Sequence, residues 1–245
     1  MAIQYRANFL IQGVMSFFWV GVSLVPLWVL FDERTTVAGW NYPGALVVMG
    51  WFVVLRGVLE GAINPSLVDV VDRIRTGSFD YLLLKPADAQ FLVSTARFEP
   101  WKIVDVTAGV GVIVYALAEL GHRPSLGQLA LAGLLLLTAV TVLYSLWILV
   151  VSASFWVVRL DNLSYLFSAI FDAGRWPVQV FRGFWRVLFT VVIPVALMTT
   201  FPAMALLGTL EPRVAAMTCG GAIAFAVLAR QIWNFSIRFY TSASS

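Results

Sequence analysis

The chain has very little of the side-chain chemistry on which soluble enzymes depend. Its 245 residues include a single cysteine, Cys219, and a single histidine, His122. One cysteine excludes a disulfide framework, and a lone cysteine in an apolar segment usually acts as a small packing residue. His122 stands in the turn sequence G-H-R-P with no cysteine or second histidine nearby. We therefore assign no metal ligand in this chain.

Charged residues are also scarce, at 12% of the chain against 60% hydrophobic residues, and the mean hydropathy is +0.88. A typical soluble domain has about 25% charged and roughly 45–50% apolar residues. This excess of apolar side chains is too large for a buried core alone, so the composition predicts an all-α polytopic membrane protein surrounded by lipid. The net charge of +3 is ordinary for such a protein, and no feature predicts nucleic-acid binding.

Motifs for nucleotide and hydrolytic chemistry are missing from the sequence. A P-loop requires G-x-x-x-x-G-K-[ST], but the only lysines, Lys85 and Lys102, occur in L-K-P and W-K-I. The sequence also lacks H-E-x-x-H and G-x-S-x-G. We therefore predict no catalytic and no cofactor-binding residue in this chain.

Apolar runs of about 20 residues are long enough to cross a bilayer. We expect six spans, and Arg6, the group Arg73, Arg75, Lys85 and Arg97, and then Arg159, Arg230 and Arg238 would then share one side. The positive-inside rule places that side, with both termini, in the cytoplasm. The expected spans cover approximately 9–31, 43–63, 101–120, 126–158, 162–181 and 213–235.

A charged amphipathic insert follows the second span, and its pattern predicts a short helix over 65–76. Asn64 is suited to cap the first turn, Pro65 to occupy it, and Gly77 to end the helix. A helix this short and polar cannot cross a bilayer, so we expect it to lie along the membrane surface or in a groove of another protein. Leu67, Val70, Val71 and Ile74 form its apolar stripe, whereas Asp69, Asp72, Arg73 and Thr76 project from the other side.

The segment before the last span is irregular. Three arginines (Arg175, Arg182 and Arg186) precede an apolar run that is interrupted at Pro194 and Pro202. Proline removes a backbone hydrogen bond inside a helix, and the freed groups need partners within a membrane. Two interpretations remain open, a full kinked span and a re-entrant hairpin over 183–210. We favour the hairpin, because it keeps the arginines outside and the last span correctly oriented. It would form an outer gate with Pro194, Phe201, Pro202 and Met204.

Four ionisable residues occur in or near the second and third spans. Arg56 and Glu60 are four residues apart, and Lys102 and Asp105 are three apart, so each pair can bridge along one helix face. Ionisable groups within a membrane often mark function, but both pairs lie near the cytoplasmic boundary, where snorkelling or structural pairing is commoner. We leave their role open.

The insert and the irregular segment both carry a family resemblance. Ile74, Arg75, Gly77, Asp80, Leu83, Lys85 and Pro86 match the pattern I-R-x-G-x-x-D-x-x-L-x-[KR]-P. With the late segment Arg175 to Pro202, this stretch resembles permeases of the ABC-2 family of ABC transporters, in a bacterial branch with that motif. The resemblance extends over nearly the whole chain.

The resemblance implies the membrane-embedded permease half of an exporter in the bacterial inner membrane. Separate ATPase subunits would bind ATP and Mg, and a second permease, identical or related, would complete the assembly. The insert would be the coupling helix and would contact the ATPase through Leu67, Asp69, Val70, Asp72, Arg73, Arg75, Gly77 and Asp80. Spans rich in Phe, Trp and Leu favour a hydrophobic or amphipathic substrate. The alternative is a polytopic membrane enzyme or proton-coupled carrier that uses Arg56, Glu60, Lys102 and Asp105.

Overall fold

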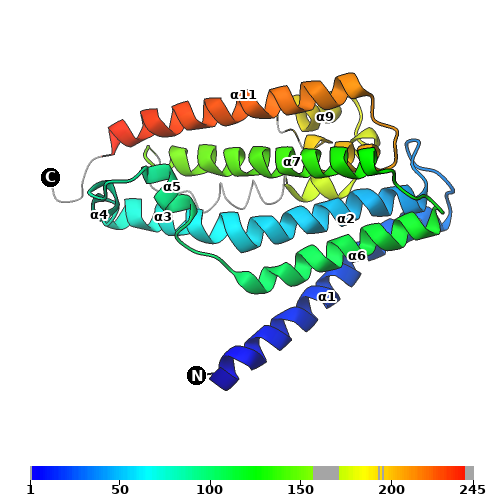
Figure 1. Cartoon of the computed structure of the whole chain (residues 1–245), viewed down its shortest axis with the longest axis horizontal. Helices are drawn as coiled ribbons and strands as arrows, with labels where there is room; N and C mark the ends of the chain where they lie inside the picture. Colours follow the sequence, from blue (N-terminus) through cyan, green and yellow to red (C-terminus); the bar gives the residue numbers. More distant parts are fainter. Residues whose placement is uncertain (1, 157–170, 193, 195, 241–245) are drawn as a thin grey trace.

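Five long helices dominate the computed structural model, which describes residues 2–156, 171–192, 194 and 196–240 (Figure 1). With the short helical turns that extend some of them, they form five helical stretches that are long and apolar enough to cross a membrane: Gly13–Asp32, Tyr42–Thr76, Pro100–Glu119, Leu126–Ala153 and Pro212–Phe239. The part of the chain that the structure describes contains no strand, only an isolated bridge between Val37 and Trp40. The long helices are α1 (Ala2–Asp32), α2 (Tyr42–Val58), α6 (Ile103–Glu119), α7 (Leu126–Ala153) and α11 (Pro212–Ser236).

Short helical pieces connect and cover the long helices. The first group follows α2 and consists of η1 (Leu59–Ile63), α3 (Asn64–Thr76), α4 (Asp80–Leu83), α5 (Ala89–Ser94) and η2 (Pro100–Lys102). The second group precedes α11 and consists of η3 (Ala173–Arg175), η4 (Val178–Val180), α9 (Gly183–Val187), η5 (Leu188–Val192), η6 (Ala196–Thr200) and α10 (Phe201–Leu206). A last turn, η7 (Ile237–Phe239), follows α11.

The expected separate helix over 65–76 is instead the end of one long helix. α2 runs through the π-helical turn η1 directly into α3, giving a continuous helix of 35 residues from Tyr42 to Thr76 (Figure 1). The prediction that Asn64 caps α3 is therefore wrong, because the preceding residues are helical and leave no free N–H groups to cap. The Asn64 side chain instead accepts a hydrogen bond of 3.2 Å from the Trp147 indole of α7. Gly77 does end the helix, in a left-handed conformation with φ 74°.

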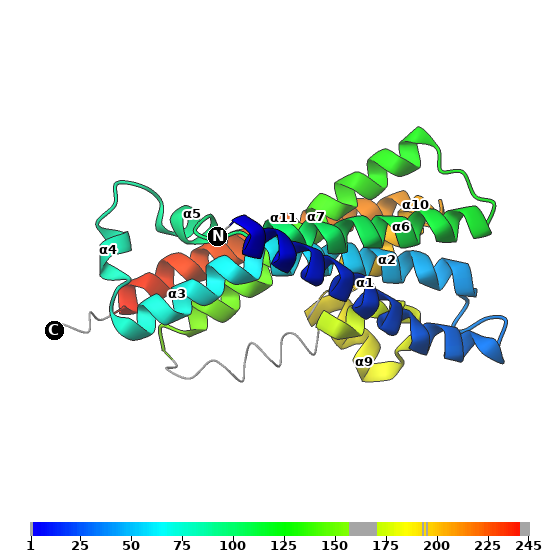
Figure 2. The same cartoon turned by 90° about the horizontal axis from the view of Figure 1, so that it is seen from below.

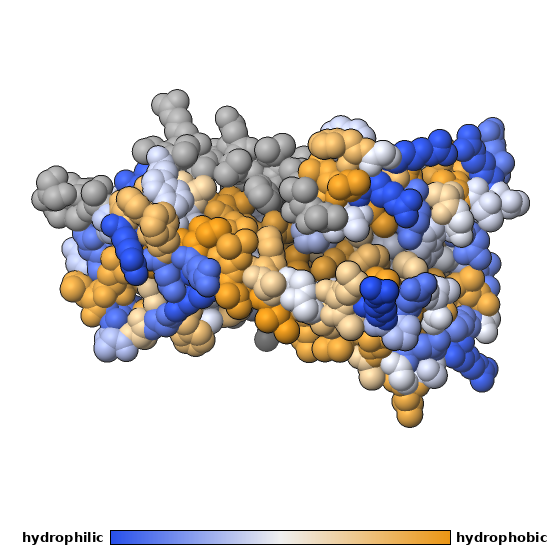
Figure 3. All heavy atoms as spheres, turned by 90° about the horizontal axis from the view of Figure 1, so that it is seen from above, coloured by the Kyte–Doolittle hydropathy of each residue, from blue (hydrophilic) through white to orange (hydrophobic). Residues whose placement is uncertain are grey.

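The helix from Tyr42 to Thr76 is longer than the hydrocarbon core of a bilayer is thick. At 1.5 Å per residue, 35 residues extend about 52 Å, whereas the hydrocarbon core of a bilayer is about 30 Å thick. The polar part, α3, accounts for the last ~20 Å. The start of α1 and the end of α11 lie toward the same end of the molecule as α3 (Figures 1 and 2). On the face shown in Figure 3, apolar residues cover the middle and polar residues gather toward both ends.

Helices α2 and α6 approach each other closely through glycines. A Cβ atom at Gly50 would lie 2.9 Å from the Gly109 carbonyl oxygen, and one at Gly57 would lie 2.9 Å from the backbone nitrogen of Val106. Interfaces with small residues allow helix backbones to approach in membranes, where lipid provides no hydrophobic force for association. We infer that α2 and α6 behave as one rigid pair.

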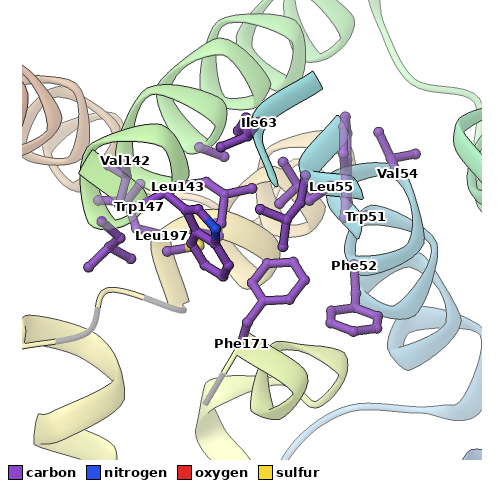
Figure 4. Close-up of a cluster of buried hydrophobic side chains, with 14 of the residues drawn as sticks. Trp51, Phe52, Val54, Leu55, Ile63, Val142, Leu143, Trp147, Phe171 and Leu197 are labelled. Carbon is purple, nitrogen blue, oxygen red and sulfur yellow. The ribbon is translucent and has the colours of Figure 1, made fainter. Parts of the chain in front are cut away.

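The core lies where α2 meets α7 and the segments before α11. Figure 4 shows Phe52 and Leu55 of α2 facing Leu143 and Trp147 of α7, with Phe171 between them. The rings of Phe52 and Phe171 have centroids 5.1 Å apart. In contrast, only 6% of the residues in the most apolar stretch of α1 are buried. Helix α1 diverges from the bundle (Figures 1 and 2) and leaves most of its surface free.

Only part of the expected fifth span can be compared with the structure. Residues 162–170 of the predicted span 162–181 lie outside the described residues, as do the last two residues of the predicted fourth span. From Ala173 onward the chain forms two short 3-10 turns, η3 and η4, rather than a continuous helix. Pro177 between them has an extended ψ of 136°. The predicted boundary at residue 181 is thus not the end of a regular helix.

The proline-containing region expected over 183–210 forms two helical limbs. α9 and η5 make the first limb, and η6 and α10 make the second. Pro194 lies between the limbs and is buried. Pro202 lies inside the continuous helical stretch Ala196–Leu206, directly after the π-helical turn η6.

Candidate functional site

The protruding end of α3 is tied to the loop that leads into α6. Asp69 accepts from Arg73 Nε at 2.6 Å and forms an ion pair of 3.0 Å with Arg97. Ser66 donates to the Arg97 carbonyl oxygen at 2.6 Å and accepts from the Arg97 backbone N–H at 2.9 Å. The Asp69 side chain is only 12% exposed. These contacts make α3 and the loop around Arg97 a single unit.

The structure divides the predicted coupling residues into an inner and an outer set. Leu67 and Val70 are buried within the chain, so the apolar stripe packs against the bundle rather than against lipid or a partner. Asp72 and Arg75 lie on the outer side, with side chains 61% and 62% exposed, and pair with each other at 3.1 Å. Arg73 is engaged with Asp69, and Asp80 begins α4. The sequence pattern could not distinguish burial inside the chain from burial against another protein.

Helix α5 is held to α11 and α7 by a polar network. Arg230 of α11 donates to Asp88 at 3.0 Å and to the Gln90 side chain at 2.7 Å. Gln90 in turn donates to the Tyr144 hydroxyl of α7 at 2.9 Å. The hydrogen bond from Arg230, with a second from the backbone N–H of Phe91, lowers the pKa of the Asp88 carboxyl below its ordinary value.

An aromatic cluster closes the same end of the molecule. Phe79, in the turn after α3, is fully buried and contacts Phe155, Trp233 and Tyr240 edge-to-face. The Tyr240 hydroxyl donates to the carbonyl oxygen of Gly77 at 3.2 Å. Edge-to-face pairs of this kind contribute about 0.5–1.5 kcal/mol each beyond area burial. The cluster fixes the end of α3 to the end of α11.

Arg56, Glu60, Lys102 and Asp105 form one charged network rather than two separate pairs. Arg56 Nε donates to Glu60 at 2.8 Å, and Lys102 lies 3.5 Å from Asp105, as the spacing predicted for each pair. In addition, Lys102 donates to Glu60 and joins α2 to the start of α6. Sequence analysis missed this bond, because nothing in the local spacing relates two residues that are 42 positions apart.

The predicted gate residues lie at the end opposite α3. Gln179 accepts from the Trp40 indole at 3.1 Å, and the His122 ring lies 3.2 Å from the Leu206 carbonyl oxygen. Trp40 belongs to the connection between α1 and α2, and His122 to that between α6 and α7. The part of the irregular segment before α9 and the end of α10 therefore both reach the same end of the bundle.

Buried threonines hold the two parts of this segment together. Thr199 donates to the Gly174 carbonyl oxygen at 2.8 Å, and Thr200 accepts from the Val178 backbone N–H at 3.1 Å. Among the predicted gate residues, Pro194 and Pro202 are buried, while Phe201 and Met204 are partly exposed. Met204 lines a cleft of about 590 Å³ beside Trp40 and Gln179. In the described residues, no group of three or more His, Cys, Asp or Glu side chains is placed to hold a metal ion.

The helices define a multi-pass membrane protein with a polar extension at one end. A family model described as ABC-2 family transporter protein matches residues 17–244, which is nearly the entire chain. The chain therefore belongs to the ABC-2 transporter family, whose members are membrane components of ABC transporters rather than enzymes. No curated protein and no solved structure matched the chain.

Proposed function

We propose that this chain is the permease subunit of an ABC-2 type exporter in the bacterial inner membrane, of the branch defined by the motif that begins at Ile74 in the last turn of α3. In this proposal, six spans place both termini and α3 in the cytoplasm. ATP and Mg bind to separate ATPase subunits, and a second permease, identical or related, completes the transport path. The membership in the ABC-2 family supports this function, since such permeases normally work with ABC ATPase subunits.

The observation that carries the proposal is the uninterrupted helix from the bundle core to the exposed end of α3. A rigid helix transmits a displacement at Asp72 and Arg75 directly to Phe52 and Leu55 in the core. The close glycine contacts join α6 to the same helix, so both would move together. An ATPase that closes on ATP binding and pushes α3 would thereby tilt two spans at once.

The outer set of coupling residues provides a surface for the ATPase. Asp72 and Arg75 are more than half exposed, and α3 projects beyond the hydrocarbon. Leu67, Val70 and Asp69 stabilise α3 from within the chain, so their role in this proposal is to hold the helix rather than to touch the partner. This narrows the contact predicted from sequence to the face that carries Asp72 and Arg75.

The irregular segment before α11 acts as the outer gate in this proposal. Both of its ends lie beside the outer connections at Trp40 and His122, which supports a hairpin that enters and leaves from the outer face. The buried threonine contacts brace it without a continuous helix, as a break at Pro194 requires. The exposed aromatic and aliphatic side chains of the spans favour a hydrophobic or amphipathic export substrate.

The surface proposed for the ATPase is tested by reversing charge at the end of α3. Asp72→Lys and Arg75→Glu each remove the local pair and invert one charge on the proposed contact, while Asp69, Leu67 and Val70 stay intact. We expect affinity-tagged protein carrying either change to insert in the membrane normally. The amount of P-loop ATPase that co-purifies with it should fall at least about tenfold, which corresponds to a loss of roughly 1.4 kcal/mol in binding free energy.

Arg123→Glu is the matched control, because Arg123 lies in the connection between α6 and α7 at the opposite end. It should leave ATPase retention unchanged. Equal retention by the wild-type chain and both α3 variants would contradict the assigned docking surface, and loss only with Arg123→Glu would reverse the proposed orientation.

A further inference from the structure

A cavity of about 250 Å³ lies between α1, α2 and α6, close to the charged network. It is lined on one side by Arg56, Glu60, Lys102 and Asp105 and on the other by Ser16, Trp19, Val20, Ser23, Phe52 and Val53. One wall is thus ionic, and the other is aromatic and aliphatic with two hydroxyl groups. A cavity of this mixed character matches a molecule with a polar head and an apolar tail.

The ionic wall has hydrogen-bond donors to spare at Arg56. Within the described part of the chain, the Arg56 guanidinium donates one hydrogen bond, from Nε to Glu60, and its two terminal nitrogens donate none, although the Asp105 and Asp172 carboxylates also interact with its charge. Glu60 accepts from Arg56 with one carboxylate oxygen and from Lys102 with the other, so both of its oxygens are paired inside the network. The Arg56 side chain remains 43% exposed. The guanidinium fork is suited to bind carboxylate or phosphate oxygens in a bidentate manner.

The depth of the site corresponds to the inner edge of the bilayer. Glu60 follows Tyr42, the first residue of α2, by 18 positions, which places it about 27 Å along the helix. A hydrocarbon core of about 30 Å beginning near Tyr42 would end just beyond Glu60. The charged network is therefore at the level where the head groups of the cytoplasmic leaflet meet the acyl chains.

The apolar wall is accessible from the side of the bundle. Helix α1 diverges from α2 and α6 (Figures 1 and 2), and Trp19 on α1 is 57% exposed although it lines the cavity. Phe52 is held in place by Phe171 and by the Arg175 guanidinium, which lies 5.6 Å from its ring centroid. A tail leaving the cavity can thus extend between α1 and the bundle into lipid without crossing the protein.

We propose that this cavity binds the anionic head group of an amphiphile from the cytoplasmic leaflet. The terminal nitrogens of Arg56 bind its phosphate or carboxylate oxygens, and its chain lies along Trp19. The network of Glu60, Lys102 and Asp105 fixes the Arg56 side chain, since Glu60 holds Nε. Binding at this site does not require the ATPase, whereas its assignment to the cytoplasmic leaflet rests on the orientation in the proposed function.

The test measures binding of tritiated hexadecyl phosphate to the purified chain in a neutral maltoside detergent. Hexadecyltrimethylammonium, which has the same hexadecyl tail and the opposite charge, serves as the comparison probe. We expect saturable binding of the phosphate probe at one site per chain and no saturable binding of the cationic probe. Arg56→Gln should weaken phosphate binding at least about tenfold.

Trp19→Ala provides a second variant that does not disturb the charged network. We expect it to weaken binding of hexadecyl phosphate about three- to tenfold, because it removes the indole ring that contacts the hexadecyl tail. Trp28→Ala is its matched control, because Trp28 is on the same helix, is 59% exposed and does not line the cavity. Equal binding by the wild-type chain and both cavity variants, or equal binding of the two probes, would overturn the site.

Two sources of such an amphiphile are distinguished by further arms of the experiment. A phospholipid that remains on the wild-type chain through purification, and is lost with Arg56→Gln in native mass spectrometry, would identify a resident membrane lipid. ATP-dependent movement of hexadecyl phosphate across the membrane of proteoliposomes that contain this chain and the ATPase would identify a transported amphiphile. Both results require the site, and binding that survives Arg56→Gln and Trp19→Ala in either arm would refute it.

Discussion

The close approach of α2 and α6 makes opposite predictions for two glycines of the same helix. A Cβ atom at Gly109 would lie 2.7 Å from the Val54 backbone nitrogen and 2.8 Å from the Gly50 carbonyl oxygen. A Cβ atom at Gly111, two residues later, would have no atom within 4 Å. We therefore expect Gly109→Ala to force the two helices apart and Gly111→Ala to be accepted without strain.

The size of the difference follows from two opposing effects. Ordinary contact requires about 3.5–4.0 Å, so α6 must move away from α2 by roughly 1 Å at Gly109. Overpacking of this kind typically costs about 1–3 kcal/mol, whereas alanine gains roughly 0.5–1 kcal/mol over glycine inside a helix. The Gly109→Ala chain should therefore be destabilised by about 0–2.5 kcal/mol, with a central value of ~1 kcal/mol, and the Gly111→Ala chain stabilised by up to ~1 kcal/mol.

Thermal unfolding of the two purified variants in one detergent measures this contrast. A change of 1 kcal/mol moves the midpoint by roughly 2–4 °C for a chain of this size. Gly109→Ala should melt several degrees below the wild-type chain, and Gly111→Ala at or slightly above it. If the two variants melted together, the close helix contact would be refuted, and with it the idea that α2 and α6 move as one body.

Two further predictions concern the two ends of the molecule, and a third concerns ATP hydrolysis. Because the pKa of Asp88 is lowered in the folded chain, its pairing with Arg230 stabilises the protein fully above the ordinary carboxylate value of about 3.9 and is lost as pH falls through the lower, folded pKa. We expect faster backbone hydrogen exchange in α5 below about pH 4, and already at neutral pH with Asp88→Asn. Because the pair is exposed, the loss in free energy of local opening should be small, roughly 0–1 kcal/mol. Unchanged exchange in Asp88→Asn would count against the pairing. Cysteines introduced near Arg182 and near Glu211 should both react with an impermeant reagent from outside the cell, whereas labelling from opposite sides would establish a full span between them. The chain purified free of other subunits should hydrolyse no ATP, and robust hydrolysis by such a preparation would contradict the permease assignment.

Residue patterns predicted several helices well because local physics determines them. Long apolar runs correspond to α1, α2, α6, α7 and α11, and the glycine at position 77 ends α3 through its own left-handed conformation. The i, i+4 pair of Arg56 and Glu60 formed as spacing alone indicated. In each case the interacting groups are close in sequence, so no knowledge of the tertiary arrangement was needed.

Features that depend on distant residues were not predicted. Asn64 has the chemistry of an N-cap, but packing of α3 against the bundle keeps the preceding turn helical and directs its side chain to Trp147. The bond between Lys102 and Glu60 connects residues 42 positions apart, and α3, on which Leu67 is buried, packs against α5 and α7 later in the chain. Tertiary packing determines the contacts of these residues, and local sequence propensity carries no information about tertiary packing.

The central claim, that α3 is where an ATPase acts on this permease, is tested most directly by photo-crosslinking in native membranes. A photoreactive amino acid placed at Asp72 or Arg75 should form a covalent product with a protein that contains a P-loop, and the yield should change when ATP and Mg are added. The same amino acid at Arg34 or Arg123 should give no such product. Crosslinks to a P-loop protein from Arg34 or Arg123, and none from α3, would contradict the account.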